Sequence, residues 1–221
     1  MEHTLAEIAD SLEKGRCKRV KDLVKLAVNE GYSPSRILEK GLLKGMENVG
    51  RRFQTETVEI PEILAITRAL NGGMEALTEL SEEEKAEKTG TALVGTMRGD
   101  VHDMGKNLVR IMLESKGLKV VDLGVDVPAH RFVDAAFSER AEVVCCSGFL
   151  KESVVDMKRM VDEFENRGLR GEVYIMVGGA AVDHEIARKI GADCYTEDAV
   201  SCGEKAYEYC RKKRRKKGKI L

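Results

Sequence analysis

Apolar residues in the first part of the chain recur at the spacing of an amphipathic α-helix. The two earliest helices that this spacing predicts have apolar faces made of Leu5, Ile8, Ala9 and Leu12, and of Val20, Leu23, Val24, Ala27 and Val28. Ser33-Pro34 supplies an N-cap and a first-turn proline for a third helix that ends near Phe53. Pro61 begins a fourth, whose apolar positions are Ile63, Leu64, Ile66, Leu70, Met74 and Leu77. The first region is therefore expected to be a small up-and-down bundle of four helices.

Residues 81–90 are almost wholly polar, and the hydrophobic period changes after them. Short apolar runs then alternate with helical stretches, which is typical of a parallel sheet covered on both faces. The predicted strands are 92–97, 119–123, 143–146, 173–177 and a short one near Cys194. We expect an α/β fold, in which a four-helix cap precedes a Rossmann-like (flavodoxin-like), doubly wound sheet of five parallel strands.

The same change of pattern predicts a helical domain over 1–88, a Rossmann-like domain over 89–215 and a basic tail over 211–221. Eight of the nine residues from Arg211 to Lys219 are basic, which leaves 29 basic against 38 acidic residues in the rest of the chain. Such a run can bind nucleic acid or an acidic partner, but here it lacks interleaved aromatic residues and follows a helix. We interpret it as a solvated helix end and expect no nucleic-acid partner.

Composition indicates an ordinary globular protein, with 34% charged and 43% hydrophobic residues. No apolar run approaches the roughly 20 residues that a membrane span needs, and the amino terminus lacks the order of a secretory signal. We therefore expect a cytoplasmic protein with no membrane partner. None of the six cysteines forms a C-x-x-C pair, so reduced thiols are expected, with Cys145 and Cys146 as small core residues.

The chemically unusual residues follow the predicted strands, at the edge where doubly wound sheets bind ligands. The loop from Gly99 to Gly105 follows the first strand and carries His102, with Asp100 two residues before it. A histidine can ligate a metal through one ring nitrogen while the other nitrogen donates a hydrogen bond to a carboxylate. His102 is therefore a candidate metal ligand.

Two further loops carry small residues that let a bulky ligand approach the backbone. Ser147-Gly148-Phe149-Leu150 follows the third strand, and Gly178-Gly179 follows the fourth. The motif D-x-H-x-x-G ends at Gly105, 41 residues separate it from Ser147, and 28 residues lie between Phe149 and Gly178. This spacing resembles the cobalamin-binding fingerprint of corrinoid methyltransferase proteins. The family's usual third element is S-x-L, whereas Phe149 stands at the leucine position here.

The resemblance covers nearly the whole chain, because a four-helix bundle also precedes this domain in the corrinoid proteins that serve methanol, methylamine and methoxyaromatic methyltransferases. The cobalamin module of methionine synthase is similar. The resemblance implies a cobalamin or related corrinoid bound base-off, with His102 as the lower axial ligand of cobalt. Asp100 and Ser153 would then tune the imidazole, Gly105 would permit close approach, and a slot would take the displaced nucleotide tail. The cofactor-binding residues that it implies are Asp100, His102, Asp103, Gly105, Ser147, Phe149, Leu150, Ser153, Gly178 and Gly179, with Thr96, Ser201 and Glu197-Asp198 as secondary candidates.

The resemblance also implies a function. Such a protein accepts a methyl group on Co(I) from a substrate-specific methyltransferase and passes it from methyl-Co(III) to a second methyltransferase, with tetrahydrofolate or coenzyme M as acceptor. A reductive activase would be a further partner. Bond making belongs to the cofactor, so the chain is expected to be a carrier subunit that is not catalytic alone. The helical cap would cover the methyl-bearing face and move about the linker at 81–90, with Glu59 facing either solvent or the corrin.

Three alternatives remain open at this point. The cobalamin subunit of an adenosylcobalamin mutase shares the fingerprint but depends on a large catalytic barrel, which this sequence does not contain. A cobalamin-sensing regulatory module usually adds a DNA-binding segment, and the first region shows no clear helix-turn-helix. A doubly wound interaction domain that binds no ligand is the third alternative.

Overall fold

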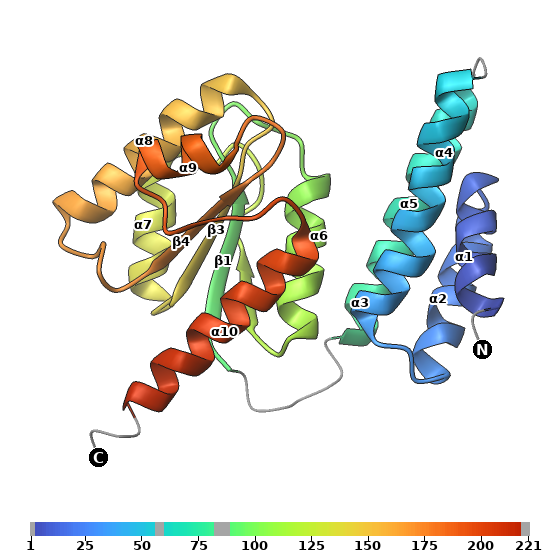
Figure 1. Cartoon of the computed structure of the whole chain (residues 1–221), viewed down its shortest axis with the longest axis horizontal. Helices are drawn as coiled ribbons and strands as arrows, with labels where there is room; N and C mark the ends of the chain where they lie inside the picture. Colours follow the sequence, from blue (N-terminus) through green and yellow to red (C-terminus); the bar gives the residue numbers. More distant parts are fainter. Residues whose placement is uncertain (1–2, 56–59, 82–88, 218–221) are drawn as a thin grey trace. The chain divides into compact units, whose positions relative to one another are not determined.

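A computed structural model describes residues 3–55, 60–81 and 89–217 of the chain. The chain divides into two compact units, Met1–Lys85 and Ala86–Leu221, each of which is described by itself below (Figure 1). Glu59 and most of the 81–90 linker lie outside the described residues.

The first unit is entirely helical in its described part. Its elements are α1 (His3–Glu13), α2 (Cys17–Asn29), α3 (Pro34–Ile37), the π-helical turn η1 (Leu38–Leu43), α4 (Lys44–Thr55) and α5 (Ile60–Ser81). Because α3, η1 and α4 follow one another without a break, they form one long helix, and the unit has the four helices that the sequence predicts. The Ser33 side chain accepts a hydrogen bond from the Arg36 N–H at 3.3 Å, and Pro34 lies in the first turn, as predicted.

The start of α5 differs from the prediction. The apolar period counts Ile63 and Leu64 among the packed residues, but both side chains are exposed. Burial begins with the next turn, where Ile66 is buried and Ala65 lies against the tight turn at Gly15. The apolar pattern therefore extends one turn beyond the packed part of this helix.

The second unit is built on a five-stranded sheet in which every pair of neighbours is parallel. Its strands are β1 (Thr91–Thr96), β2 (Lys119–Asp122), β3 (Val143–Ser147), β4 (Tyr174–Gly178) and β5 (Cys194–Tyr195). They lie in the order β2-β1-β3-β4-β5, which is the order of flavodoxin-like sheets. The predicted fold class is confirmed, with strand ends within about two residues of the sequence-based ranges.

Helices cover both faces of this sheet (Figure 1). One face carries α6 (Met104–Ser115) and α10 (Ala199–Lys217); the other carries α7 (Ala129–Ser138), α8 (Lys151–Asn166) and α9 (His184–Ile190). Successive residues of a strand point to opposite faces, so Leu93 belongs to the core under α7 and α8, while Ala92 and Val94 belong to the core under α6 and α10. Burial on both sides explains why the central strands β1, β3 and β4 are largely apolar.

The strand order places the site. β1 and β3 are hydrogen-bonded neighbours although β2 lies between them in sequence, so the chain leaves β1 in one direction and β3 in the other. A crevice forms at such a switch point, beyond the carboxyl ends of the strands. The register pairs Thr96 with Ser147 and Ser147 with Gly178, so β1, β3 and β4 end side by side.

The remaining features agree with the sequence interpretation. All six cysteines are free thiols, and Cys145 and Cys146 are buried in the sheet. The basic run from Arg211 to Lys217 lies in the last turns of α10, where Arg211 is exposed. Within the described ranges, no helix is both long enough and apolar enough to cross a membrane.

Candidate functional site

The carboxylate of Asp100 lies at the centre of the loops that follow β1 and β3. Its side chain is fully buried, at 0% exposure. Oδ1 accepts hydrogen bonds from the backbone N–H of His102 at 2.9 Å and is 2.7 Å from the His102 Nδ1. Oδ2 accepts from the backbone N–H of Phe149 at 2.5 Å and from the Ser153 hydroxyl at 3.3 Å. One buried group therefore joins the β1 loop, the β3 loop and the first turn of α8.

These contacts determine the charge of the group. Burial raises the pKa of Asp100, but the backbone N–H groups of Phe149 and His102 and the imidazole lower it by more, so that the pKa lies below its ordinary value. Asp100 is thus ionised at neutral pH. Ser153 contacts this carboxylate and not the imidazole, so it can act on His102 only through Asp100.

The same contacts select the form of the His102 ring. An ionised carboxylate only accepts hydrogen bonds, so Nδ1 carries a proton and Nε2 of the neutral ring carries the free lone pair. Within the described part of the chain, Nε2 has no hydrogen-bond partner, and the His102 side chain is 47% exposed. The loop thus presents one oriented nitrogen ligand to solvent.

Phe149 adds an aromatic contact to this arrangement. Its ring stacks on the His102 imidazole, with centroids 4.2 Å apart and planes inclined by 27°. The side chain is 52% exposed, unlike the fully buried Phe132 and Phe164. Sequence reasoning named Phe149 as a candidate but did not anticipate the stack, because the two residues are 47 positions apart.

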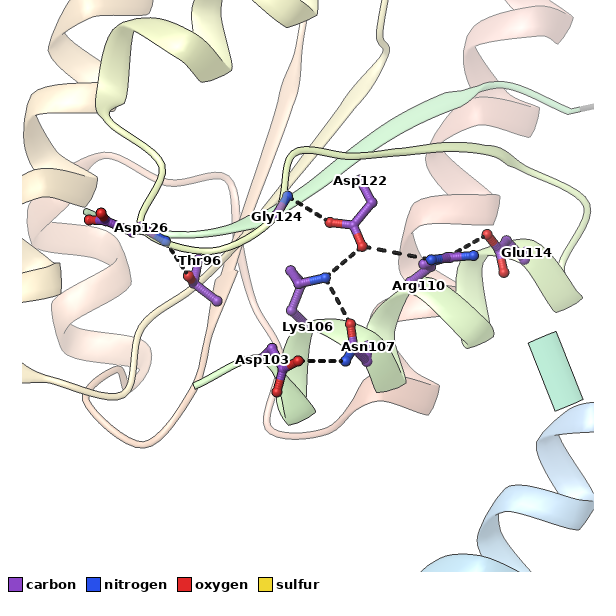
Figure 2. Close-up of polar contacts among 9 residues, drawn as sticks. All are labelled: Thr96, Asp103, Lys106, Asn107, Arg110, Glu114, Asp122, Gly124 and Asp126. Atoms are coloured by element: carbon purple, nitrogen blue, oxygen red, sulfur yellow. Dashed lines mark hydrogen bonds and ion pairs between the residues drawn. The ribbon is translucent and has the colours of Figure 1, made fainter. Parts of the chain in front are cut away.

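The β2 to α7 connection supports the His102 loop from behind. The Thr96 hydroxyl donates a hydrogen bond to the Asp100 carbonyl oxygen at 2.5 Å. It also accepts one from the Asp126 N–H at 3.1 Å (Figure 2). The Asp126 carboxylate accepts from the Gly99 N–H at 2.6 Å. Asp126 has φ of 55°, a conformation that aspartate tolerates better than most residues. Thr96 is completely buried, so it supports the loop and does not face a ligand.

A second polar network fixes the start of α6 (Figure 2). The buried Lys106 ammonium lies 2.6 Å from Asp122 at the end of β2 and donates to Asn107 at 2.8 Å. Asp122 also accepts from the Gly124 N–H at 2.9 Å. Because α6 begins two residues after His102, this network holds the helix against the sheet edge next to the site. This network was not predicted from the sequence. The signal that could have revealed it is Lys106, a lysine within the apolar face of the predicted helix.

The glycines after the strands have two different roles. A side chain on Gly105 would meet only the Ser147 hydroxyl, at 3.6 Å, so this position is open. Gly179 has φ of 104°, and a Cβ there would lie 2.4 Å from the Gly148 carbonyl oxygen. The fold itself therefore requires Gly179, whether or not a ligand binds. Gly178 is intermediate, because its Cβ would approach the Thr196 carbonyl oxygen at 3.0 Å.

The other candidate residues named from the sequence make local contacts. Asp103 is exposed and accepts from Asn107 at 3.2 Å (Figure 2). Leu150 precedes α8, and its carbonyl accepts from the Ser153 N–H at 3.0 Å. Asp198 caps the start of α10 through the Ser201 N–H at 2.8 Å.

The site offers one exposed imidazole as a possible metal ligand. Among the described residues, no group of three or more His, Cys, Asp and Glu side chains could hold a bare metal ion. A single imidazole suits a metal whose other ligands come from a macrocycle. The same loops expose the apolar side chains Val101, Met104, Val125 and Phe149, which suit a flat, largely apolar ligand.

Comparison with known proteins agrees with this geometry. Residues 4–78 and 90–201 match two family models, each described as a B12 binding domain. The dimethylamine corrinoid protein of Methanosarcina barkeri is 38% identical over 208 residues, which cover 94% of this chain and 97% of that protein. The chain belongs to the B12-binding corrinoid proteins.

Solved structures of this family share the fold. The monomethylamine corrinoid protein of Methanosarcina barkeri superimposes with a TM-score of 0.78 at 31% identity, covering 94% of this chain and 98% of that one. A methanol:cobalamin methyltransferase complex from the same organism gives a TM-score of 0.53 at 25% identity, covering 96% of this chain and 84% of that one. The family resemblance seen in the sequence is thereby confirmed, and the single exposed imidazole and its apolar surroundings fit a corrinoid.

Replacing the central carboxylate tests whether it joins the loops. Asp100→Asn keeps the size of the side chain but places an amide N–H among buried donors, so we expect a loss of about 1.5–3 kcal/mol in the free energy of unfolding. Asp103→Asn is the matched control in the same loop and should stay within about 0.5 kcal/mol of the parent, because Asp103 is exposed. Urea denaturation measures both. Equal stability of the two variants would contradict the central role of Asp100.

Proposed function

We propose that this protein is a methyl carrier that binds a corrinoid base-off, with Nε2 of His102 as the lower axial ligand of cobalt. One feature supports this most directly: the buried, ionised Asp100 orients the half-exposed imidazole of His102 at the switch point of the sheet. Oδ1 of Asp100 lies 2.7 Å from Nδ1 of His102. A bound corrinoid supplies a cobalt that can accept a methyl group and give it up again. The residues of this chain hold, orient and shield that group.

Each loop has a part in the proposed site. Asp100 engages Nδ1 of His102 and so selects the tautomer in which Nε2 is the nitrogen with the free lone pair. A Cβ on Gly105 would lie 3.6 Å from the Ser147 hydroxyl, so the start of α6 and the end of β3 lie side by side, and we assign the displaced nucleotide tail to this edge. Gly178 lies at the same edge, in register with Ser147.

The partners are proposed from the relatives. The related proteins are named for dimethylamine, monomethylamine and a methanol methyltransferase complex, so the part they share is the corrinoid protein and the part that differs is the methyl donor. We infer that a substrate-specific methyltransferase loads this chain and that a second methyltransferase unloads it, with tetrahydrofolate or coenzyme M as the acceptor. A reductive activase would restore the carrier after oxidation. On this proposal the chain is not catalytic alone.

Axial ligation by His102 can be tested in the purified protein. We expect apo-protein to take up one hydroxocobalamin and, after one-electron reduction, to give an EPR spectrum split by an imidazole nitrogen. The splitting should change when histidine is labelled with nitrogen-15. His102→Ala should lose this signature and bind at least about tenfold more weakly, equivalent to 1.4 kcal/mol. His130→Ala, an exposed histidine in α7, is the matched control. An unchanged spectrum in His102→Ala would exclude His102 as the ligand.

The tail path gives an independent test. Gly105 is the second residue of α6 and has room for a methyl group, so Gly105→Ala should preserve or raise stability, by up to about 1 kcal/mol. It should nevertheless lower the affinity for cobalamin several-fold while leaving cobinamide, which lacks the nucleotide tail, nearly unaffected. Gly171→Ala, which also has open space, serves as control. Titrations with cobalamin and with cobinamide measure the two changes in affinity. Equal losses of affinity for the two ligands would place Gly105 against the corrin ring instead of the nucleotide tail.

The carrier role predicts dependence on partners. Protein that carries a reduced corrinoid should react negligibly with dimethylamine, monomethylamine or methanol alone. The described site offers no group that activates a methyl donor. Addition of a cognate methyltransferase should make the absorbance of the cobalt centre change rapidly and saturably. Fast reaction without a partner would show that this chain is an enzyme in its own right.

A further inference from the structure

Two contacts determine the orientation of the His102 ring, and only one of them belongs to the family pattern. The hydrogen bond from Nδ1 to Asp100 fixes one edge of the ring at 2.7 Å. The Phe149 ring covers one face, with the centroids 4.2 Å apart. The backbone N–H of Phe149 also donates to Asp100, so one carboxylate contacts both the His102 ring and the backbone that carries the Phe149 ring.

The covalent tether at Cβ and one hydrogen bond at Nδ1 still allow the imidazole plane to tilt, through coupled changes in the two side-chain torsions of His102. This tilt matters here because the His102 side chain is 47% exposed. Such a tilt would turn Nε2, the other ring nitrogen, away from the direction in which it must meet a metal. The Phe149 ring, inclined by only 27° to the imidazole, opposes the tilt: motion towards it leads to a collision, and motion away from it loses the stacking contact.

The choice of residue also needs an explanation. Phe149 is 52% exposed, so burial in the core does not account for an aromatic side chain there. The family fingerprint has leucine at this position, and leucine has no flat face to stack on an imidazole. The observed stack supplies the reason: an aromatic pair contributes about 0.5–1.5 kcal/mol beyond its buried area, a factor of roughly two to ten in the population of the stacked orientation.

We propose that Phe149 is a positioning residue for the axial imidazole: its ring sets the plane of the His102 ring and keeps Nε2 directed outward before and after cobalt binds. This inference rests on the proposed role of His102. Phe149 acts through His102 and takes no part in bond making. The chain thus carries an orienting contact that a protein with leucine at this position lacks.

The test compares Phe149→Leu with Phe149→Tyr. Both variants retain the backbone N–H on Asp100, and the tyrosine also retains a stacking ring. Phe137→Leu, which removes an exposed aromatic ring at the end of α7, is the matched control. In apo-protein, NMR contacts between the His102 and Phe149 rings should be present in the parent and in Phe149→Tyr. In Phe149→Leu the imidazole should show averaged orientations.

The second readout uses protein loaded with cob(II)alamin. The EPR spectrum gives the ratio of cobalt without imidazole nitrogen to cobalt with it, and this ratio should rise between about twofold and tenfold in Phe149→Leu. Phe149→Tyr and Phe137→Leu should match the parent. If the parent lacks the nitrogen splitting, His102 does not ligate cobalt and that part of the proposed function is wrong, whichever result the Phe149 variants give. If the parent shows the splitting and Phe149→Leu equals it in both readouts, the positioning role is overturned.

Discussion

The carboxylate of Asp100 lies where the loops after β1 and β3 meet, and it accepts hydrogen bonds from both of them. Removing an ionised carboxylate from water costs several kcal/mol, and this cost is offset only when enough donors surround the charge. Backbone N–H groups, a hydroxyl and an imidazole do so here. The burial of one charge therefore requires that two loops and the start of α8 keep fixed positions.

This requirement produces the exposed part of the site. The buried carboxylate holds Nδ1 of His102, and the half-exposed ring leaves its second nitrogen available to a metal. Rigid strand ends support the loop, and Thr96 and Asp126 hold it from behind. A site on such a base is arranged before any ligand arrives, which suits a protein that must hold a reactive cofactor in one orientation while partners exchange.

Much of the fold could be predicted from the sequence because its signals are local. Ser33-Pro34 begins a helix because a hydroxyl and a ring with fixed φ act on their own neighbours. The central strands β1, β3 and β4 are recognisable because burial on both faces makes them largely apolar runs. The difference at Ile63 and Leu64 has the complementary cause: the apolar period shows which residues could pack, whereas tertiary contacts decide which ones do.

The sequence by itself determined the α/β class, the two-part organisation, and the loop in which Asp100 and His102 lie two residues apart. It could not determine what surrounds that carboxylate, because the Phe149 N–H and the Ser153 hydroxyl come from 49 and 53 residues away. Only the tertiary structure, through the parallel register of β1 with β3, brings them to one point. That register also brings Phe149 onto His102. The register of β3 with β4 brings Gly179 against Gly148, so the role of Gly179 in the fold also depends on backbone placed by a different strand.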